Sequence, residues 1–158
     1  MKIERIWAMP NKWTFTIKPI KELLQREVHG KWVDPFCGKN SRAQLKNDLN
    51  PENEADSHTD ALEFLKSLQS GWDGVLYDPP YSMRQASECY KEFGVEKLNI
   101  SITSMLYWKS IKDEMARIIR HGGKAICFGW SSMGLGKGRR FDMKEILLVP
   151  HGGSRNDT

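Results

Sequence analysis

The sequence predicts an α/β fold with a mainly parallel sheet that carries helices on both faces. Short apolar segments alternate along the chain with amphipathic segments of helical spacing, and this alternation is typical of parallel sheets. Two of the apolar segments run directly into Asp-Pro, at Asp34 and at Asp78. Since ligands of such sheets bind at the carboxyl ends of the strands, we expect the functional residues at these two turns.

Apolar residues at helical spacing predict three helices, at residues 19–28, 61–68 and about 103–121. The glycines that follow these segments suit C-terminal caps: Gly30, Gly71 and the pair Gly122-Gly123. Short apolar runs predict four buried strands, at residues 32–33, 75–77, 124–128 and 145–149.

The length of 158 residues fits a single domain, residues 1–158. No apolar run approaches the ~20 residues that span a bilayer, and the N-terminus lacks the apolar stretch of a signal peptide. We therefore expect a cytoplasmic protein without a membrane partner. The cysteines Cys37, Cys89 and Cys127 are widely spaced, so they predict neither a metal site nor a disulfide. The net charge of +4 is compatible with a polyanionic partner without requiring one.

The segment Asp78-Pro79-Pro80-Tyr81 directly follows the predicted strand 75–77. Each proline removes a backbone N–H donor and fixes φ, so this turn offers acceptors: the Asp78 carboxylate and the carbonyl groups of Asp78 and Pro79. Converging acceptors suit a substrate that brings N–H donors, such as an exocyclic amino group. Tyr81 offers a ring on which a planar base can stack. A simple strand-ending turn is the alternative interpretation.

Asp-Pro-Pro-Tyr resembles the catalytic motif of the amino methyltransferases, which form N6-methyladenine or N4-methylcytosine in DNA. The resemblance implies a Rossmann-like class I methyltransferase fold and S-adenosyl-L-methionine as the cofactor. It also implies adenine-containing DNA as the partner, with the target base flipped out of any duplex. The aspartate in the first motif position favours N6 of adenine over N4 of cytosine. Asp78, Pro79, Pro80 and Tyr81 are then the catalytic residues.

Four further segments resemble the cofactor motifs of that family, and all five segments occur in an order that the family permits. The resemblance implies the following cofactor-binding residues: Phe15 and Thr16 before the first helix, Asp34, Pro35, Phe36 and Gly38 after the first buried strand, Asp48 and Leu49 after the family's second strand, and Asp60 and Ala61 at the second helix. On this match Asp48 binds the ribose hydroxyls and Asp60 the adenine amino group. Asp60 and Glu63 also have the spacing of a helix capping box, and both roles are compatible.

The sequence departs from the family pattern in two places. Only nine residues separate Gly38 from Asp48, which leaves no room for the helix that the family has after its cofactor loop. We therefore predict that this helix is missing or reduced to a turn, and that the cofactor site is more open on that side. The sequence stops at residues 156–158, where relatives begin a last antiparallel strand. That strand is expected to be missing, with a homodimer as one way to cover the sheet edge.

No segment has the length of a separate target-recognition domain. The loops 82–100 and 131–140 are the candidate substrate contacts. In the second loop Lys137, Arg139 and Arg140 lie among glycines, and such a flexible basic loop suits DNA phosphates. A solvated hairpin is the alternative interpretation of this loop.

Two alternatives to a DNA adenine-N6 methyltransferase stay open. Related motifs serve RNA and protein-glutamine amino methyltransferases. The shortened cofactor loop is also compatible with a degenerate module that binds nucleic acid without catalysis. A P-loop or dinucleotide enzyme is disfavoured, because neither GxxxxGK[ST] nor a strand-linked GxGxxG occurs.

Overall fold

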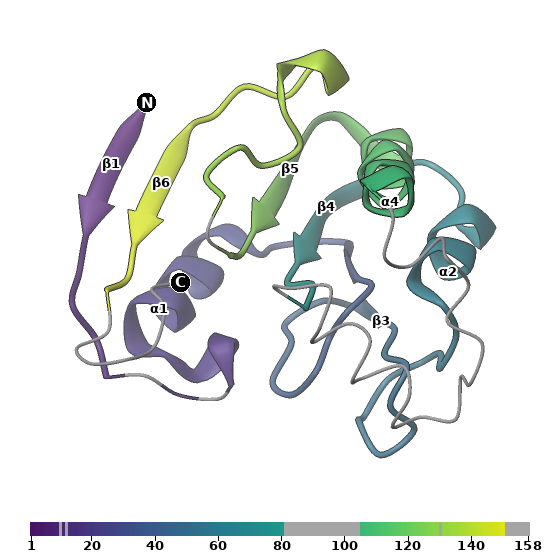
Figure 1. Cartoon of the computed structure of the whole chain (residues 1–158), viewed down its shortest axis with the longest axis horizontal. Coiled ribbons are helices and arrows are strands. Elements are labelled where there is room, and N and C mark those ends of the chain that lie inside the picture. The colour runs from purple at the N-terminus through teal and green to yellow at the C-terminus, as the bar shows by residue number, and fades with distance from the viewer. Residues whose placement is uncertain (10, 12, 81–104, 130, 151–158) are drawn as a thin grey trace.

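The computed structural model describes residues 1–9, 11, 13–80, 105–129 and 131–150 (Figure 1). Its elements follow in this order: β1 (Lys2–Arg5), η1 (Thr14–Thr16), α1 (Lys18–Glu27), β2 (Trp32–Asp34), β3 (Leu45–Lys46), α2 (Ala61–Ser67), β4 (Trp72–Tyr77), α4 (Met105–Ile118), β5 (Ile119–Cys127), η2 (Lys137–Arg139) and β6 (Glu145–Leu148). The three predicted helices and the four predicted strands are present, and the α/β class is confirmed.

The main sheet has four strands in the order β3-β2-β4-β5, and every neighbouring pair is parallel. A second sheet pairs β1 with β6, also in parallel. From β2 the chain moves outward to β3 and then returns to the other side of β2 to form β4. The strand order therefore reverses between β2 and β4, where Asp34 ends β2 and Asp78 directly follows β4. This is the place where open parallel sheets bind ligands.

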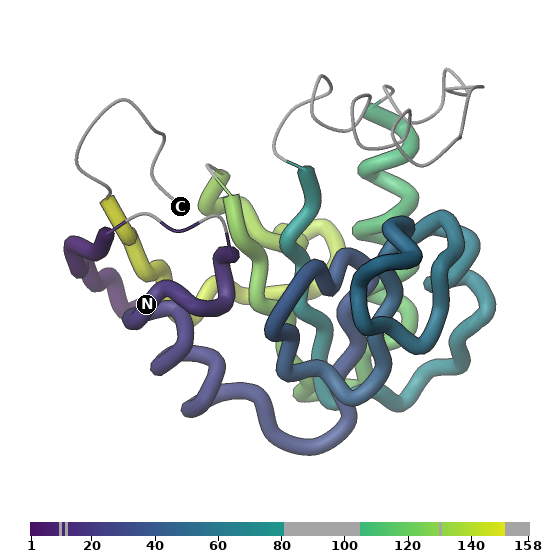
Figure 2. Tube along the Cα trace, turned by 90° about the horizontal axis from the view of Figure 1, so that it is seen from below, coloured from purple at the N-terminus to yellow at the C-terminus, as the bar shows by residue number. Residues whose placement is uncertain are grey.

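Successive residues of β4 point to opposite faces of the sheet, and each face has its own core. Val75 and Tyr77 belong to one buried cluster, together with residues of α2 and α4. Leu76 belongs to a second cluster, together with residues of η1 and α1. Figure 2 shows the purple-blue α1 on one side of the strands and the green α4 on the other. The prediction of helices on both faces is thus confirmed.

The indole of Trp32 fixes the contact between β2 and β4. Trp32 is 1% exposed, and its Nε1 donates a hydrogen bond to the His29 carbonyl at 2.9 Å. A Cβ atom added to Gly74, the partner of Trp32 in the neighbouring strand, would lie 2.6 Å from the indole ring. Glycine at position 74 therefore allows a large aromatic side chain to be buried beside a central strand.

The structure differs from the predicted boundaries at the end of α4. The helix ends at Ile118, and β5 begins at Ile119 rather than at Lys124. The register between β4 and β5 is irregular here: Trp72 pairs with Ile119, whereas Gly74 pairs with Lys124. The pair Gly122-Gly123 lies inside this bulge, and Gly122 has φ +76°. Both glycines therefore serve an irregular strand start rather than a helix cap.

The predicted loss of a helix after the first buried strand, β2, is confirmed. Residues 35–44, all of which are described, contain turns and bends but no helix. The expected absence of a last strand concerns residues beyond 150, which lie outside the described part of the chain. Among the residues that the structure describes, no helix has the length and apolar character needed to cross a membrane.

Candidate functional site

Asp34 ends β2 at the point where the strand order reverses, and it is fully buried. Its Oδ1 accepts a hydrogen bond from the Phe36 backbone N–H at 3.0 Å, and its Oδ2 accepts one from the Ser41 hydroxyl at 2.6 Å. Burial raises the pKa of the Asp34 carboxyl to about 7, although these two hydrogen bonds lower it. A carboxyl group poised near neutral pH in a ligand-binding position is a functional candidate.

Three carboxyl groups converge at this edge of the sheet. Asp78 and Asp48 both lie close enough to Asp34 for their charges to raise its pKa further. Neither Asp34 nor Asp48 forms an ion pair with a lysine or arginine in the described part of the chain. Asp34 and Asp48 could therefore balance a ligand with positive charge at this edge.

Asp48 connects β3 to the loop that follows β2. Its Oδ2 accepts a hydrogen bond from the Gly38 backbone N–H at 2.7 Å, and its Oδ1 accepts one from the Asn50 N–H at 2.9 Å. Each carboxylate oxygen can accept a second hydrogen bond, so Asp48 keeps acceptor capacity for ligand hydroxyls. Gly38 has φ +49°, and a Cβ added there would meet no atom within 4 Å. The loop therefore passes this position with open space beside it.

Asn47 joins the same loop to the segment before α2, a role that sequence reasoning missed. The side chain is 1% exposed. Its Nδ2 donates to the carbonyls of Pro35 and Thr59 at 3.2 and 3.0 Å, and its Oδ1 accepts from the Thr59 N–H at 3.1 Å. Because each partner is 12 residues away, no local sequence pattern could have revealed the contact.

Asp60 caps α2, as its spacing with Glu63 predicted. Its Oδ1 accepts hydrogen bonds from the backbone N–H groups of Leu62 and Glu63 at 2.9 and 3.2 Å. The Glu63 carboxylate pairs with the Lys66 ammonium group at 2.9 Å. The Asp60 Oδ2 accepts a hydrogen bond from the Tyr107 hydroxyl of α4 at 2.6 Å. Its role as a helix cap is therefore confirmed, while contact with an adenine stays a prediction.

The structure also describes most of the other residues of the resemblance. Asp78, Pro79 and Pro80 follow β4 and are half-buried, whereas Tyr81 lies outside the described residues. Pro35, Ala61 and Phe15 are buried, and Leu49 is half-buried.

Aromatic rings surround this edge. The Phe15 ring packs edge-on against Phe128, with the centroids 5.3 Å apart. The Phe36 ring lies 5.9 Å from the Tyr77 ring and 6.1 Å from the Trp108 ring. Phe36 thereby links the loop after β2 to the end of β4 and to α4.

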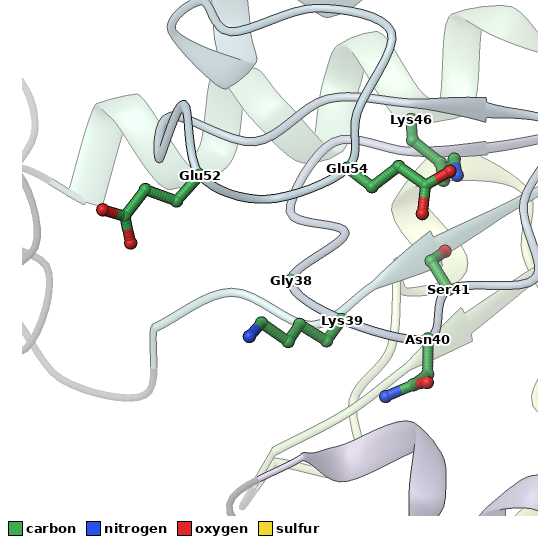
Figure 3. A pocket seen from close by; sticks show the side chains of 7 residues that line it. All are labelled: Gly38, Lys39, Asn40, Ser41, Lys46, Glu52 and Glu54. Atoms are coloured by element: carbon green, nitrogen blue, oxygen red, sulfur yellow. The ribbon is translucent and has the colours of Figure 1, made fainter.

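The loop that replaces the missing helix lines a polar pocket of about 340 Å³ (Figure 3). Residues 38–41 form one wall, and Glu52 and Glu54 lie on the facing loop. Among the described residues, those that line this pocket all come from positions 38–54, and Asp78 is not one of them. Lys39 of this loop also lies over the Trp13 ring, 4.8 Å from its centroid. A polar pocket therefore lies beside Gly38, while the predicted opening of a cofactor site stays a prediction.

The predicted basic loop is partly held by α4. Arg139 donates to the Asp113 carboxylate at 2.7 Å and to the Leu135 carbonyl at 2.9 Å, while Lys137 and Arg140 are exposed. Figure 1 shows η2 at the end of the sheet opposite the arrowheads of β4 and β5. A phosphate held by these cations would therefore lie away from the edge with Asp34 and Asp78.

The described thiols give no sign of reactivity. Burial raises the pKa of Cys37 to about 12 and that of Cys127 to about 11, so both are protonated at neutral pH. Cys89 lies outside the described residues. No group of three or more His, Cys, Asp or Glu side chains within the described ranges could hold a metal ion.

Comparison with known proteins adds no family assignment. No protein-family model, curated protein or solved structure matches this chain. The geometry of the strand-reversal edge is therefore the basis for assigning a function.

Proposed function

We propose that this protein is an S-adenosylmethionine-dependent methyltransferase that methylates the exocyclic amino group of a base in DNA, at N6 of adenine. One observation carries the proposal. The Asp-Pro-Pro turn after β4 lies across the point of strand reversal from the Asp-Pro-Phe turn after β2. A ligand bound at that point contacts both turns, so a cofactor on one side and a base on the other would meet there.

The residues at this edge fit a cationic cofactor. When bound, S-adenosylmethionine supplies a methyl group on a positively charged sulfur atom. The carboxyl groups of Asp34, Asp48 and Asp78 bring negative charge to the edge. Asp34 and the backbone near Gly38 would hold the amino-acid end, and Asp48 would accept hydrogen bonds from the ribose hydroxyls. Asp60 and Ala61 would lie near the adenine of the cofactor.

Asp78 and Pro79 act on the substrate in this proposal. The Asp78 carboxylate and the Pro79 carbonyl accept the two N–H groups of the target amino group. Hydrogen bonding there draws the nitrogen toward tetrahedral geometry and frees its lone pair for bond formation. Neither Pro79 nor Pro80 has an N–H that could compete for the Asp78 carboxylate. Holding two reactants in place can contribute ~7–11 kcal/mol to lowering the barrier.

Transfer of labelled methyl groups tests the proposal. The full chain is incubated with radiolabelled S-adenosylmethionine and unmethylated DNA, and the DNA is digested to nucleosides for mass spectrometry. We expect N6-methyladenine with the parent protein. With Asp78→Ala turnover should fall roughly a hundredfold or more, the range for losing a positioned hydrogen-bonding group. The matched control is Asp142→Ala, since Asp142 is exposed and lies outside the site. Its turnover should equal that of the parent.

Three outcomes would overturn the proposal in distinct ways. Methylated RNA with unmodified DNA would change the substrate. Methylation of a protein glutamine, with unmodified DNA, would identify a protein as the substrate. Absence of cofactor binding in calorimetry, with and without DNA, would indicate a module that binds nucleic acid without catalysis.

A further inference from the structure

The ionisation of Asp34 depends on a balance between its two hydrogen bonds, which favour the carboxylate, and its burial and neighbouring negative charges, which oppose it. The side chain is 0% exposed. Its carboxyl faces Asp78 at the end of β4 and Asp48 after β3, and both charges oppose ionisation. The neighbouring Cys37 thiol is protonated and supplies no compensating charge. Ionisation is favoured by the Phe36 N–H and the Ser41 hydroxyl.

Only the Ser41 donor is a side-chain group, so a substitution can remove it. The Phe36 N–H belongs to a turn that Asp34 forms with its own backbone, two residues further on. The Ser41 hydroxyl reaches back seven residues from the loop that lines the pocket, and it donates at 2.6 Å. Such a short O–H···O distance is typical of a hydrogen bond to a charged acceptor.

A third group contacts the Ser41 hydroxyl. The Ala43 backbone N–H donates a hydrogen bond to the Ser41 Oγ at 3.3 Å. This bond uses one of the two acceptor positions of the oxygen and is compatible with donation of the hydroxyl proton to Asp34. The chain from Ala43 through Ser41 to Asp34 can therefore stabilise a carboxylate.

We propose that Ser41 is a positioning residue of the cofactor site, whose hydroxyl favours the ionised form of the buried Asp34, so that from about neutral pH upward the site carries a negative charge that attracts a cationic cofactor. This inference rests on the proposed function. It adds that affinity for the cofactor depends on pH through Asp34 and that Ser41 sets the pH range. Without the hydroxyl, burial and the charges of Asp48 and Asp78 would leave Asp34 protonated at pH 7.

Calorimetric titration with S-adenosylmethionine between pH 6 and 9 tests the inference. In the parent, affinity should rise with pH as Asp34 ionises. In Ser41→Ala it should be roughly five- to tenfold weaker at pH 7, which is the order expected for losing a hydrogen bond to a charged group. It should return to within about twofold of the parent at pH 9, because Asp34 then ionises without help. A merely structural role for Ser41 would weaken binding equally at every pH.

Two further variants separate the possible causes. Ser41→Thr keeps the hydroxyl and should restore the pH profile of the parent. Ser70→Ala is the matched control, because Ser70 is exposed and distant in sequence from the loop. Carbon-13 NMR of the Asp34 carboxyl in the ligand-free protein measures the titration midpoint of Asp34 directly, so parent and variants can be compared without cofactor. Ser41→Ala should move its titration midpoint to higher pH, and Ser41→Thr should not.

The outcomes distinguish this inference from the proposed function. If the parent binds no S-adenosylmethionine at any pH, the proposed function fails. If the parent binds it but Ser41→Ala shows the affinity of the parent across the pH range, or an equal loss throughout, the role of Ser41 fails alone. An unchanged Asp34 titration midpoint in Ser41→Ala would also overturn it.

Discussion

At Asp34, burial and hydrogen bonding act in opposite directions on one carboxyl group. The side chain is shielded from water, yet it occupies the strand-reversal edge where ligands of parallel sheets bind. An apolar residue would pack there without the cost of a buried charge. A buried aspartate with two hydrogen-bond donors among the described residues therefore fits a role in ligand binding better than a role in stability.

Replacing Asp34 with asparagine should stabilise the protein in a pH-dependent manner. The folded-state pKa is about 7, above the unfolded value of about 3.9. At a pH between these two pKa values, Asp34 is protonated in the native state and ionised in the unfolded state. The free energy of unfolding of the parent therefore falls as pH rises from about 4 to about 7. Asp34→Asn removes this fall. The free energy of unfolding is measured by urea for both proteins at pH 5 and at pH 8. From pH 5 to pH 8, the difference between variant and parent should shift by roughly 2–4 kcal/mol in favour of the variant.

Comparing the stability difference between variant and parent at pH 5 with that at pH 8 separates the effect of ionisation from the effect of packing. Any steric effect of the amide is the same at both pH values. Asp142→Asn provides the control, since Asp142 is exposed. An equal stability difference at pH 5 and pH 8 for Asp34→Asn would mean that Asp34 does not titrate in this range.

At the scale of elements, polar contacts join α2 and α4, the two helices that cover one face of the sheet. Arg117 of α4 donates to the carbonyls of Leu65 and Leu68 at 3.1 and 3.0 Å, and Tyr107 of α4 contacts Asp60 at the start of α2. Asp60 caps α2, and its second carboxylate oxygen accepts the Tyr107 hydroxyl of α4. Tyr107 is 5% exposed and lies in the same core as Val75 and Ile111. The contact therefore fixes the start of α2 against α4.

A double-mutant cycle should measure this coupling. Tyr107→Phe removes the donor, and Asp60→Ala removes the acceptor together with the helix cap. We expect each single variant to lose about 1–2 kcal/mol of unfolding free energy, and the pair to show a coupling of about 1 kcal/mol. The exposed Glu63–Lys66 ion pair of α2 is the comparison, with an expected coupling below about 0.5 kcal/mol. Additive losses for Asp60 and Tyr107 would show that the contact does not couple the helices.

The strands that could be predicted from the sequence are those that are buried on both faces of the sheet, because burial on both faces produces a continuous apolar run. β2 and β4 are apolar runs because helices cover both faces of the sheet. β1 escaped prediction because Lys2–Arg5 is mostly charged and exposed, and β3 because it has only two residues.

Within the candidate site, the motif positions could be predicted but their connections could not. Asp34, Asp48 and Asp60 stand out because of the residues beside them. The hydrogen bonds of Ser41, Asn47 and Tyr107 join segments that are 7, 12 and 47 residues apart. Such contacts depend on tertiary packing, which a local pattern does not contain.

For the molecule as a whole, the missing helix changes how the ligand edge is supported. Each face of the sheet has a core, yet residues 35–44 cross the end of β2 without a helix of their own. The loop is held instead by polar contacts: Asp48 to Gly38, Ser41 to Asp34, and Asn47 to Pro35. A loop fixed by a few hydrogen bonds opens more readily than one packed under a helix. Ligand binding at this edge should therefore stabilise the loop more than the rest of the fold.

Amide hydrogen exchange with and without S-adenosylmethionine should show this localised stabilisation. At a ligand concentration about 100 times the Kd, binding stabilises the bound state by ~2.7 kcal/mol, so amides that exchange through loop opening should slow by about a hundredfold. We expect this for the amides of Phe36, Gly38 and Asn50, which donate to Asp34 and Asp48. Amides that join β1 to β6, such as Ile6, should keep their rates, because that pair lies outside the four-stranded sheet. Protection confined to residues 52–54 would instead place the ligand in the adjoining polar pocket, away from the turn that Asp78 begins.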